Sequence, residues 1–258
     1  MKMEIARDAR PQVRTLLFAT ALAVALWFIP FADVLTYPFR IFVTFIHEGG
    51  HAFAALLTGN TVQSLSVNLD ASGETYTTQG GLISQFFIAS AGYVGAMIYG
   101  ALLLMLIRRS IAARFVLIGS AAFILVLTVT YGLFSPLLHG VLFDPFTIIA
   151  GVLLVLGLVF SARYASPRVA SFLMSFLAVQ CVLNALFDLK TVLFLSTASN
   201  VTTDAMNMRN ATGIPAIFWA LLWVSVAFVI LSIALRLYAV KQNQPSQPDL
   251  PFEDSPEV

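Results

Sequence analysis

The stretch HEGGH, residues 47–51, lies in the middle of an apolar segment, residues 38–58, which has the length of a membrane-spanning helix. On a helix His47 and His51 are four residues apart, so both imidazoles project from the same face, with Glu48 beside them. This is the H-E-x-x-H arrangement, in which two histidines bind zinc and the glutamate acts as a general base. Ionisable side chains at membrane depth are costly and usually mark function, so the motif predicts a zinc site.

A structural alternative exists for the same residues. Two buried histidines can instead bond to backbone carbonyls, with Glu48 neutral or paired with Arg40. A chance match to the motif is rare, about one in a thousand at this composition, and this rarity favours the zinc site. The third histidine, His139, follows Ser135-Pro136 and precedes a glycine, so we interpret it as an interfacial loop residue and not as a ligand.

The composition indicates a polytopic membrane protein. Hydrophobic residues make up 59% of the chain and charged residues 10%, against about 25% charged in a soluble domain. A net charge of +1 gives no footprint of nucleic-acid binding. The single cysteine, Cys181, excludes an internal disulfide and a cysteine-based metal site, and is interpreted as a small core residue.

Seven apolar segments follow one another along the chain, each about long enough to cross the hydrocarbon as a helix. They are residues 15–37, 38–58, 81–107, 115–134, 145–162, 169–196 and 214–240. The predicted fold class is therefore an all-α polytopic membrane protein with six or seven transmembrane helices. We predict a basic N-terminal segment at 1–14, retained and not cleaved as a signal peptide, a membrane-embedded domain that carries the motif at 15–240, and a disordered polar tail at 241–258.

Residues 60–80, between the second and third apolar segments, have a different pattern. Apolar and polar residues alternate over 64–70, residues 71–73 form a turn signal, and 74–78 are a second strand candidate. The pattern predicts a small β-hairpin between two helices. Two interpretations remain open for it. It is either an ordinary extramembrane hairpin or an edge strand that binds an unwound substrate segment by β-addition.

Catalytic zinc needs a third protein ligand as well as an open position. Asp188 is the carboxylate that lies well inside a long apolar segment, so it is predicted as the third ligand; the alternative is a carboxylate satisfied by Lys190, Asn184 or water. Asn184, one turn earlier, either supports the site, binds substrate or contacts another helix. Asp204 lies near a segment end and either supports the site or is a loop residue or helix N-cap.

Together these residues resemble the site-2 protease family of intramembrane zinc metallopeptidases, and most closely its compact bacterial branch, which has no inserted PDZ domain. The resemblance covers residues 41–223. It rests on HEGGHA at 47–52, Thr58-Gly59, the hairpin with Gly73, GYVG at 92–95 and the late aspartate Asp188. It implies His47, His51 and Asp188 as zinc ligands and Glu48 as the base.

The resemblance further implies a metalloendopeptidase with Zn²⁺ as its cofactor, in a multi-pass protein of the bacterial cell membrane. Its expected partners are the lipid bilayer and a membrane-spanning protein substrate. Two other functions are compatible with the residues. A cation-coupled transporter would use the same ionisable cluster, but it predicts internal repeats that the sequence does not show. A non-catalytic membrane scaffold of the same fold would not need Glu48, which is intact.

Overall fold

The computed structural model describes residues 10–26, 28–78, 80–108, 112–198 and 203–239. The predicted polar tail, 241–258, and residues 1–9 of the predicted basic segment lie outside the described residues. The elements are α1 (Arg10–Leu26), α2 (Asp33–Leu57), β1 (Val62–Val67), β2 (Gly73–Thr77), α3 (Leu82–Arg108), α4 (Ala113–Val126), the π-helix η2 (Leu127–Phe134), α5 (Ser135–Leu138), α6 (Pro145–Tyr164), α7 (Pro167–Ala198), α8 (Asp204–Thr212) and α9 (Ala216–Ala239).

The predicted all-α polytopic fold is confirmed. Five helices in the described part of the chain are long and apolar enough to cross a membrane: Leu82–Ile107, Ala113–Leu138, Pro145–Tyr164, Pro167–Val192 and Ala216–Leu237. The apolar part of α1, Arg14–Leu26, is shorter than a span, and α2 carries the charged side chains of the motif. The number of apolar spans in the described residues is thus lower than the six or seven predicted.

The first two apolar segments divide at a different place from the predicted boundary at residues 37 and 38. The chain turns between α1 and α2, where Phe31 has a positive φ of 65° and Ala32 precedes the first residue of α2. Pro38 lies inside α2, near its start, where a missing N–H interrupts only one helical hydrogen bond. The helix therefore continues unbroken through residues 47–51.

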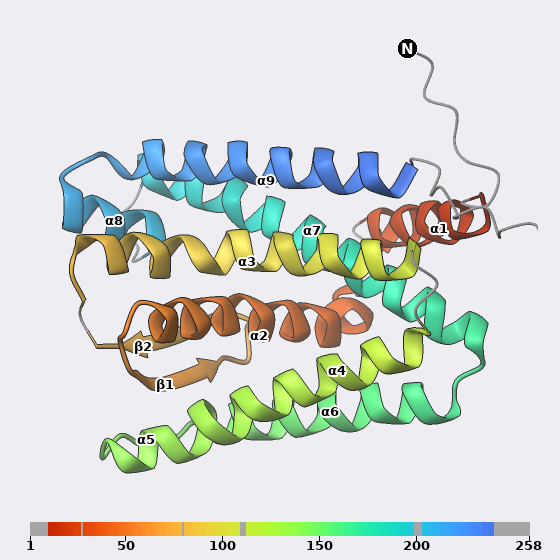
Figure 1. Cartoon of the computed structure of the whole chain (residues 1–258), viewed down its shortest axis with the longest axis horizontal. Helices are drawn as coiled ribbons and strands as arrows, with labels where there is room; N and C mark the ends of the chain where they lie inside the picture. Colours follow the sequence, from red (N-terminus) through yellow and green to blue (C-terminus); the bar gives the residue numbers. More distant parts are fainter. Residues whose placement is uncertain (1–9, 27, 79, 109–111, 199–202, 240–258) are drawn as a thin grey trace, which may run out of the picture.

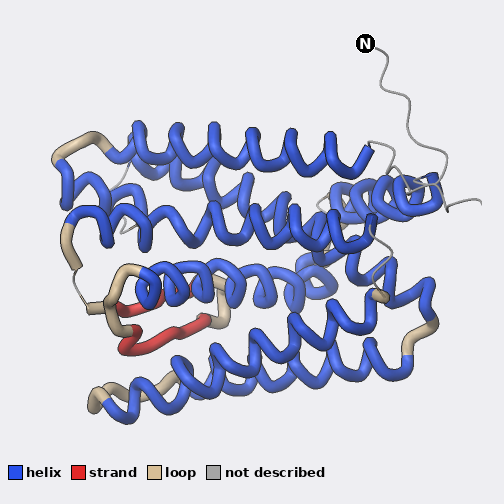
Figure 2. The backbone as a smooth tube through the Cα atoms, in the orientation of Figure 1, coloured by secondary structure: helices blue, strands red, loops and turns tan. Residues whose placement is uncertain are grey.

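The predicted hairpin is present as an antiparallel pair in which Leu65 of β1 faces Thr75 of β2. It lies beside α2 (Figure 2). Two hydroxyls bind the outer edge of β1: Ser135 Oγ donates to the carbonyl of Val62 at 2.6 Å, and Thr147 Oγ1 accepts from the N–H of Val67 at 2.8 Å. Because η2, α5 and α6 bind this edge, the sheet cannot be extended on the β1 side.

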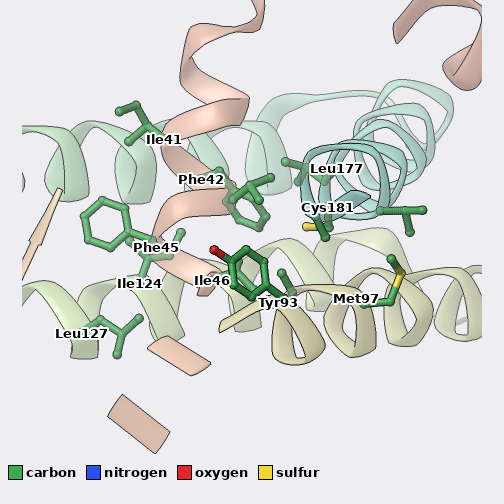
Figure 3. Close-up of a cluster of buried hydrophobic side chains, with 14 of the residues drawn as sticks. Ile41, Phe42, Phe45, Ile46, Tyr93, Met97, Ile124, Leu127, Leu177 and Cys181 are labelled. Carbon is green, nitrogen blue, oxygen red and sulfur yellow. The ribbon is translucent and has the colours of Figure 1, made fainter. Parts of the chain in front are cut away.

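The helices pack around α3, which contacts α2, α7 and α9, while α4 and α6 pair on the far side of α2 (Figure 1). Phe42 of α2, Met97 of α3, Ile124 of α4 and Leu177 of α7 meet in one buried cluster (Figure 3). In a bilayer such contacts stabilise the fold mainly through close packing, since lipid tails are as apolar as the side chains. This packing fixes α2, and with it the motif, in the interior of the bundle.

Candidate metal centre

The motif residues lie together on the inner part of α2. One ligand atom from each of His47, Glu48 and His51 lies within 4.8 Å of the others, and the two imidazole ring centroids are 4.8 Å apart. Glu48 and His51 are 4% and 6% exposed. The four-residue spacing on one helix thus produces a compact, buried group of metal-ligating atoms, as the sequence predicts.

A hydrogen bond from α3 fixes the orientation of His51. Its Nδ1 lies 2.6 Å from the carbonyl oxygen of Ile88. A carbonyl can only accept, so Nδ1 carries a proton, and Nε2 is the ring nitrogen that can bind a metal. Metal-binding histidines usually have such a partner for the other ring nitrogen, because it sets both the tautomer and the ring angle. His51 is therefore prepared to bind a metal through Nε2.

Gly92 of α3 lets the two histidines approach the backbone of that helix closely. A Cβ placed on Gly92 would meet Nε2 of His47 first and would lie 2.5 Å from Nε2 of His51. The next residue, Tyr93, has its ring edge-on to His47, with centroids 4.6 Å apart. Both Nε2 atoms therefore lie close together against the α3 backbone, at a position where only glycine leaves enough room.

Asp204 at the start of α8 completes the cluster. Its Oδ2 lies 3.6 Å from Nε2 of His47 and 3.5 Å from Nε2 of His51. Burial alone raises the pKa of the Asp204 carboxyl, but the adjacent imidazoles of His51 and His47 outweigh it and hold the pKa well below its ordinary range. The aspartate is therefore an anion that faces both histidines.

The position of Asp204 follows from how α8 folds back onto the bundle. Thr203 caps the helix, its Oγ1 accepting from the N–H of Met206 at 3.3 Å, so Asp204 is the first helical residue and not the cap. Ala205 and Met208 are fully buried against the neighbouring helices α3 and α9. The packing of Ala205 and Met208 therefore orients α8 so that Asp204, its first residue, lies toward α2.

Asp188, the predicted third ligand, lies on α7 with an exposed side chain. It is close enough to His47 and Arg40 to interact electrostatically, but it makes no hydrogen bond or ion pair with either histidine among the described residues. Asn184 donates to the carbonyl and to Oε1 of Gln180 on its own helix, at 2.9 and 3.0 Å. The structure thus places Asp204, and not Asp188, against the two histidines.

Glu48 has a partner that the sequence did not reveal. Thr75 Oγ1 of β2 lies 2.7 Å from Oε2 of Glu48 and 3.2 Å from its carbonyl oxygen. The alternative pairing of Glu48 with Arg40 is not what the structure shows, because Arg40 donates to the carbonyl of Asp70 at 3.1 Å. The sequence indicated only that Thr75 shares one face of the predicted strand with residues 73 and 77, because side chains alternate between the two faces of a strand.

The remaining singled-out residues lie outside the cluster. His139 follows α5, and its Nδ1 lies 2.8 Å from the carbonyl oxygen of Ser135, a local contact within one turn. Cys181 is fully buried in the apolar core, where Figure 3 shows it near Leu177. Neither residue adds a ligand to the group formed by α2 and α8.

A bundle of apolar helices that buries an H-E-x-x-H helix defines the class of membrane metallopeptidases. The chain belongs to the Peptidase M50B-like family, whose sequence model matches residues 16–234. The resemblance to the site-2 proteases is thereby confirmed, and with it a family of typically zinc-dependent metallopeptidases. Neither the curated proteins nor the solved structures include a match to this chain.

Proposed function

We propose that this protein is an intramembrane zinc metalloprotease that hydrolyses peptide bonds of membrane-spanning substrates. The observation that carries the proposal is the convergence of His47, His51 and Asp204 beside Glu48 in the interior of a helical membrane protein. Two neutral nitrogens and one anionic oxygen form a donor set that zinc prefers in catalytic sites, with a fourth position left for water or substrate.

The spacing of the donor atoms fits zinc. Atoms that share a tetrahedral zinc at about 2.0–2.2 Å lie roughly 3.3–3.6 Å apart. The distances from Asp204 Oδ2 to the two Nε2 atoms, 3.6 and 3.5 Å, fall within this range. We therefore propose His47, His51 and Asp204 as the ligands, with Asp204 in place of Asp188. Zinc bound there would polarise the scissile carbonyl and lower the pKa of a bound water.

Glu48 has the position of a general base. It follows His47 directly on α2, its carboxylate is buried, and it belongs to the same compact group of ligand atoms. In the proposed reaction Glu48 takes a proton from the attacking water and passes it to the leaving amine as the peptide bond breaks. Thr75 holds one carboxylate oxygen, which leaves the other oxygen available for this transfer.

The open edge of the hairpin offers a place for the substrate backbone. Among the described residues β2 pairs only with β1, and the hydroxyls of Ser135 and Thr147 bind the other edge of β1. Since backbone groups alternate along an antiparallel pair, those of Gly73, Thr75 and Thr77 face the open edge next to Glu48. A helical substrate shields its carbonyls, so a locally extended segment that pairs here would present them for cleavage.

The two rival functions explain less of this arrangement. A cation-coupled transporter gives no role to a hairpin that contacts the motif glutamate. A scaffold would not require the Asp204 carboxylate to lie within 3.6 Å of Nε2 of both imidazoles. The proteolytic function accounts for the ligands, the base and the strand together.

The proposal is tested by comparing membranes of cells that express the wild-type chain or the Glu48→Gln variant. We expect both purified proteins to contain about one zinc per chain, since Glu48 is not a ligand, and only the wild type to generate new termini in membrane-spanning proteins, read by mass spectrometry. Wild-type protein without zinc, or new termini that form equally with Glu48→Gln, would overturn the proposal.

A further inference from the structure

The hairpin contacts the motif glutamate at two points. Thr75 Oγ1 lies 2.7 Å from Oε2 of Glu48, a distance typical of a hydroxyl that donates to a carboxylate. Because a hydroxyl has one proton, the shorter contact to the carboxylate, and not the 3.2 Å contact to the Glu48 carbonyl, is the stronger bond. Thr75 is half-buried and Glu48 is 4% exposed, so the bond is partly shielded from bulk water.

The second contact comes from Gly73 at the start of β2. A Cβ on Gly73 would lie 2.7 Å from both Cγ and Oε1 of Glu48, and equally close to Cγ2 of Thr44. The backbone of β2 therefore lies directly against the Glu48 side chain, and only a residue without a side chain permits this approach. Gly73 and Thr75 confine the carboxylate from one side while α2 holds it from the other.

The choice of threonine makes this contact rigid. A β-branched side chain has few χ1 rotamers on a strand, so its hydroxyl direction is set by the backbone. The strand is itself fixed, because Thr147 and Ser135 bind the far edge of its partner β1. The position of the Thr75 hydroxyl is thus fixed by the pairing of β2 with β1 and by the hydrogen bonds that hold β1 against the helices.

We propose that Thr75 is a positioning residue that holds Oε2 of Glu48 and thereby fixes the orientation of the carboxylate that takes a proton from the attacking water. The inference rests on the proposed proteolytic function and adds to it a residue outside the H-E-x-x-H motif. Loss of the hydroxyl leaves the carboxylate in place but free to rotate, which reduces the fraction of molecules with the base aligned. The hairpin then acts on the chemical step as well as on any substrate that pairs with its edge.

The test uses Thr75→Val, which removes the hydroxyl at nearly constant shape, and Thr75→Ser, which restores it. Thr61→Val is the matched control, because Thr61 is an exposed residue of the same hairpin. The probe is a synthetic single-span peptide with a quenched fluorophore, in phosphatidylcholine vesicles with the full-length protein. We expect Thr75→Val to keep zinc and KM and to lower kcat by about 10- to 100-fold. Thr75→Ser should recover most of the rate.

A second measurement does not depend on cleavage. Thr75→Val should lower the thermal unfolding temperature of the wild type but not that of Glu48→Ala, because the bond exists only when both partners are present. Equal effects in the two backgrounds would show that Thr75 does not act through Glu48. A Thr75→Val enzyme with wild-type kcat, or with lost zinc or only a raised KM, would also overturn the inference.

The two proposals fail in distinguishable ways. If the wild type does not cleave, or if Glu48→Gln cleaves as fast, the proteolytic function is wrong, whatever Thr75 does. If the wild type cleaves and Glu48→Gln does not, while Thr75→Val matches Thr61→Val in every readout, only the role of Thr75 is wrong.

Discussion

Oδ2 of Asp204 on α8 lies 3.5 Å from Nε2 of His51 on α2, and the same oxygen lies 3.6 Å from Nε2 of His47. One carboxylate oxygen therefore faces the Nε2 atoms of both imidazoles, which is how a third ligand would meet a shared metal. Asp188, on the more apolar helix α7, reaches neither nitrogen by hydrogen bond or ion pair within the described part of the chain. Substitution of Asp204 and substitution of Asp188 are therefore expected to have different effects on zinc binding.

Asp204→Asn should weaken zinc binding strongly, because the amide keeps the shape of the side chain but removes the anionic donor. The expected loss exceeds the about 10- to 100-fold effect typical of residues that only support a ligand. Zinc content of the purified protein, measured by mass spectrometry across a chelator titration, gives the result. Asp188→Asn is the matched control and should retain zinc; the reverse outcome would return the ligand role to Asp188.

Gly92→Ala should also abolish zinc binding, although it changes no ligand. The added methyl would lie 2.5 Å from Nε2 of His51 and against Nε2 of His47, in the space that both atoms face. Gly95→Ala provides the control on the same helix, since its methyl would make an ordinary 3.5 Å contact with Gly50. Zinc retained by the Gly92 variant at the wild-type level would mean that the metal binds elsewhere.

Zinc should stabilise the folded protein, because a ligand that binds only the native state adds free energy that rises with the logarithm of its concentration relative to the dissociation constant. At free zinc about 100-fold above the dissociation constant the gain is roughly 2.7 kcal/mol. The midpoint of thermal unfolding in detergent should therefore fall on chelation and recover when zinc is added. His51→Ala should unfold at one temperature under both conditions, and a zinc-dependent shift in that variant would argue against His51 as a ligand.

Thr77→Pro should slow cleavage without loss of zinc. The N–H of Thr78 donates to the carbonyl of Thr61, so the N–H of Thr77 points the other way, to the open edge of β2. Proline removes this donor and should weaken a paired substrate strand, raising KM more than it changes kcat. Thr77→Ala keeps the N–H and should cleave normally. Equal kinetics for the two variants would show that the substrate does not pair with this edge.

The sequence predicted the parts of the site that depend on one helix. His47, Glu48 and His51 are brought together by the helical repeat alone, so their spacing was sufficient. The hairpin was likewise predicted from local alternation and a turn signal. Both predictions needed no knowledge of how the helices pack.

Which aspartate lies against the two histidines depends on tertiary contacts, which the sequence does not show. Asp204 lies on a short polar helix, and only the packing of Ala205 and Met208 against the bundle brings its carboxylate to α2. Asp188 lies in a long apolar helix, which suggested burial, yet its side chain is exposed. The boundary between the first two helices was also misplaced, because Phe31 adopts a left-handed backbone conformation that composition does not indicate.

The contact between α2 and α8 joins an early part of the polypeptide to a late one. During synthesis His47, Glu48 and His51 leave the ribosome before α3 to α7, and Asp204 leaves it after them. A nascent or truncated chain that ends before residue 204 has the two imidazoles and the base but lacks the carboxylate that faces them. The candidate metal centre thus requires a chain that extends into α8, and shorter chains lack the aspartate that faces the two histidines.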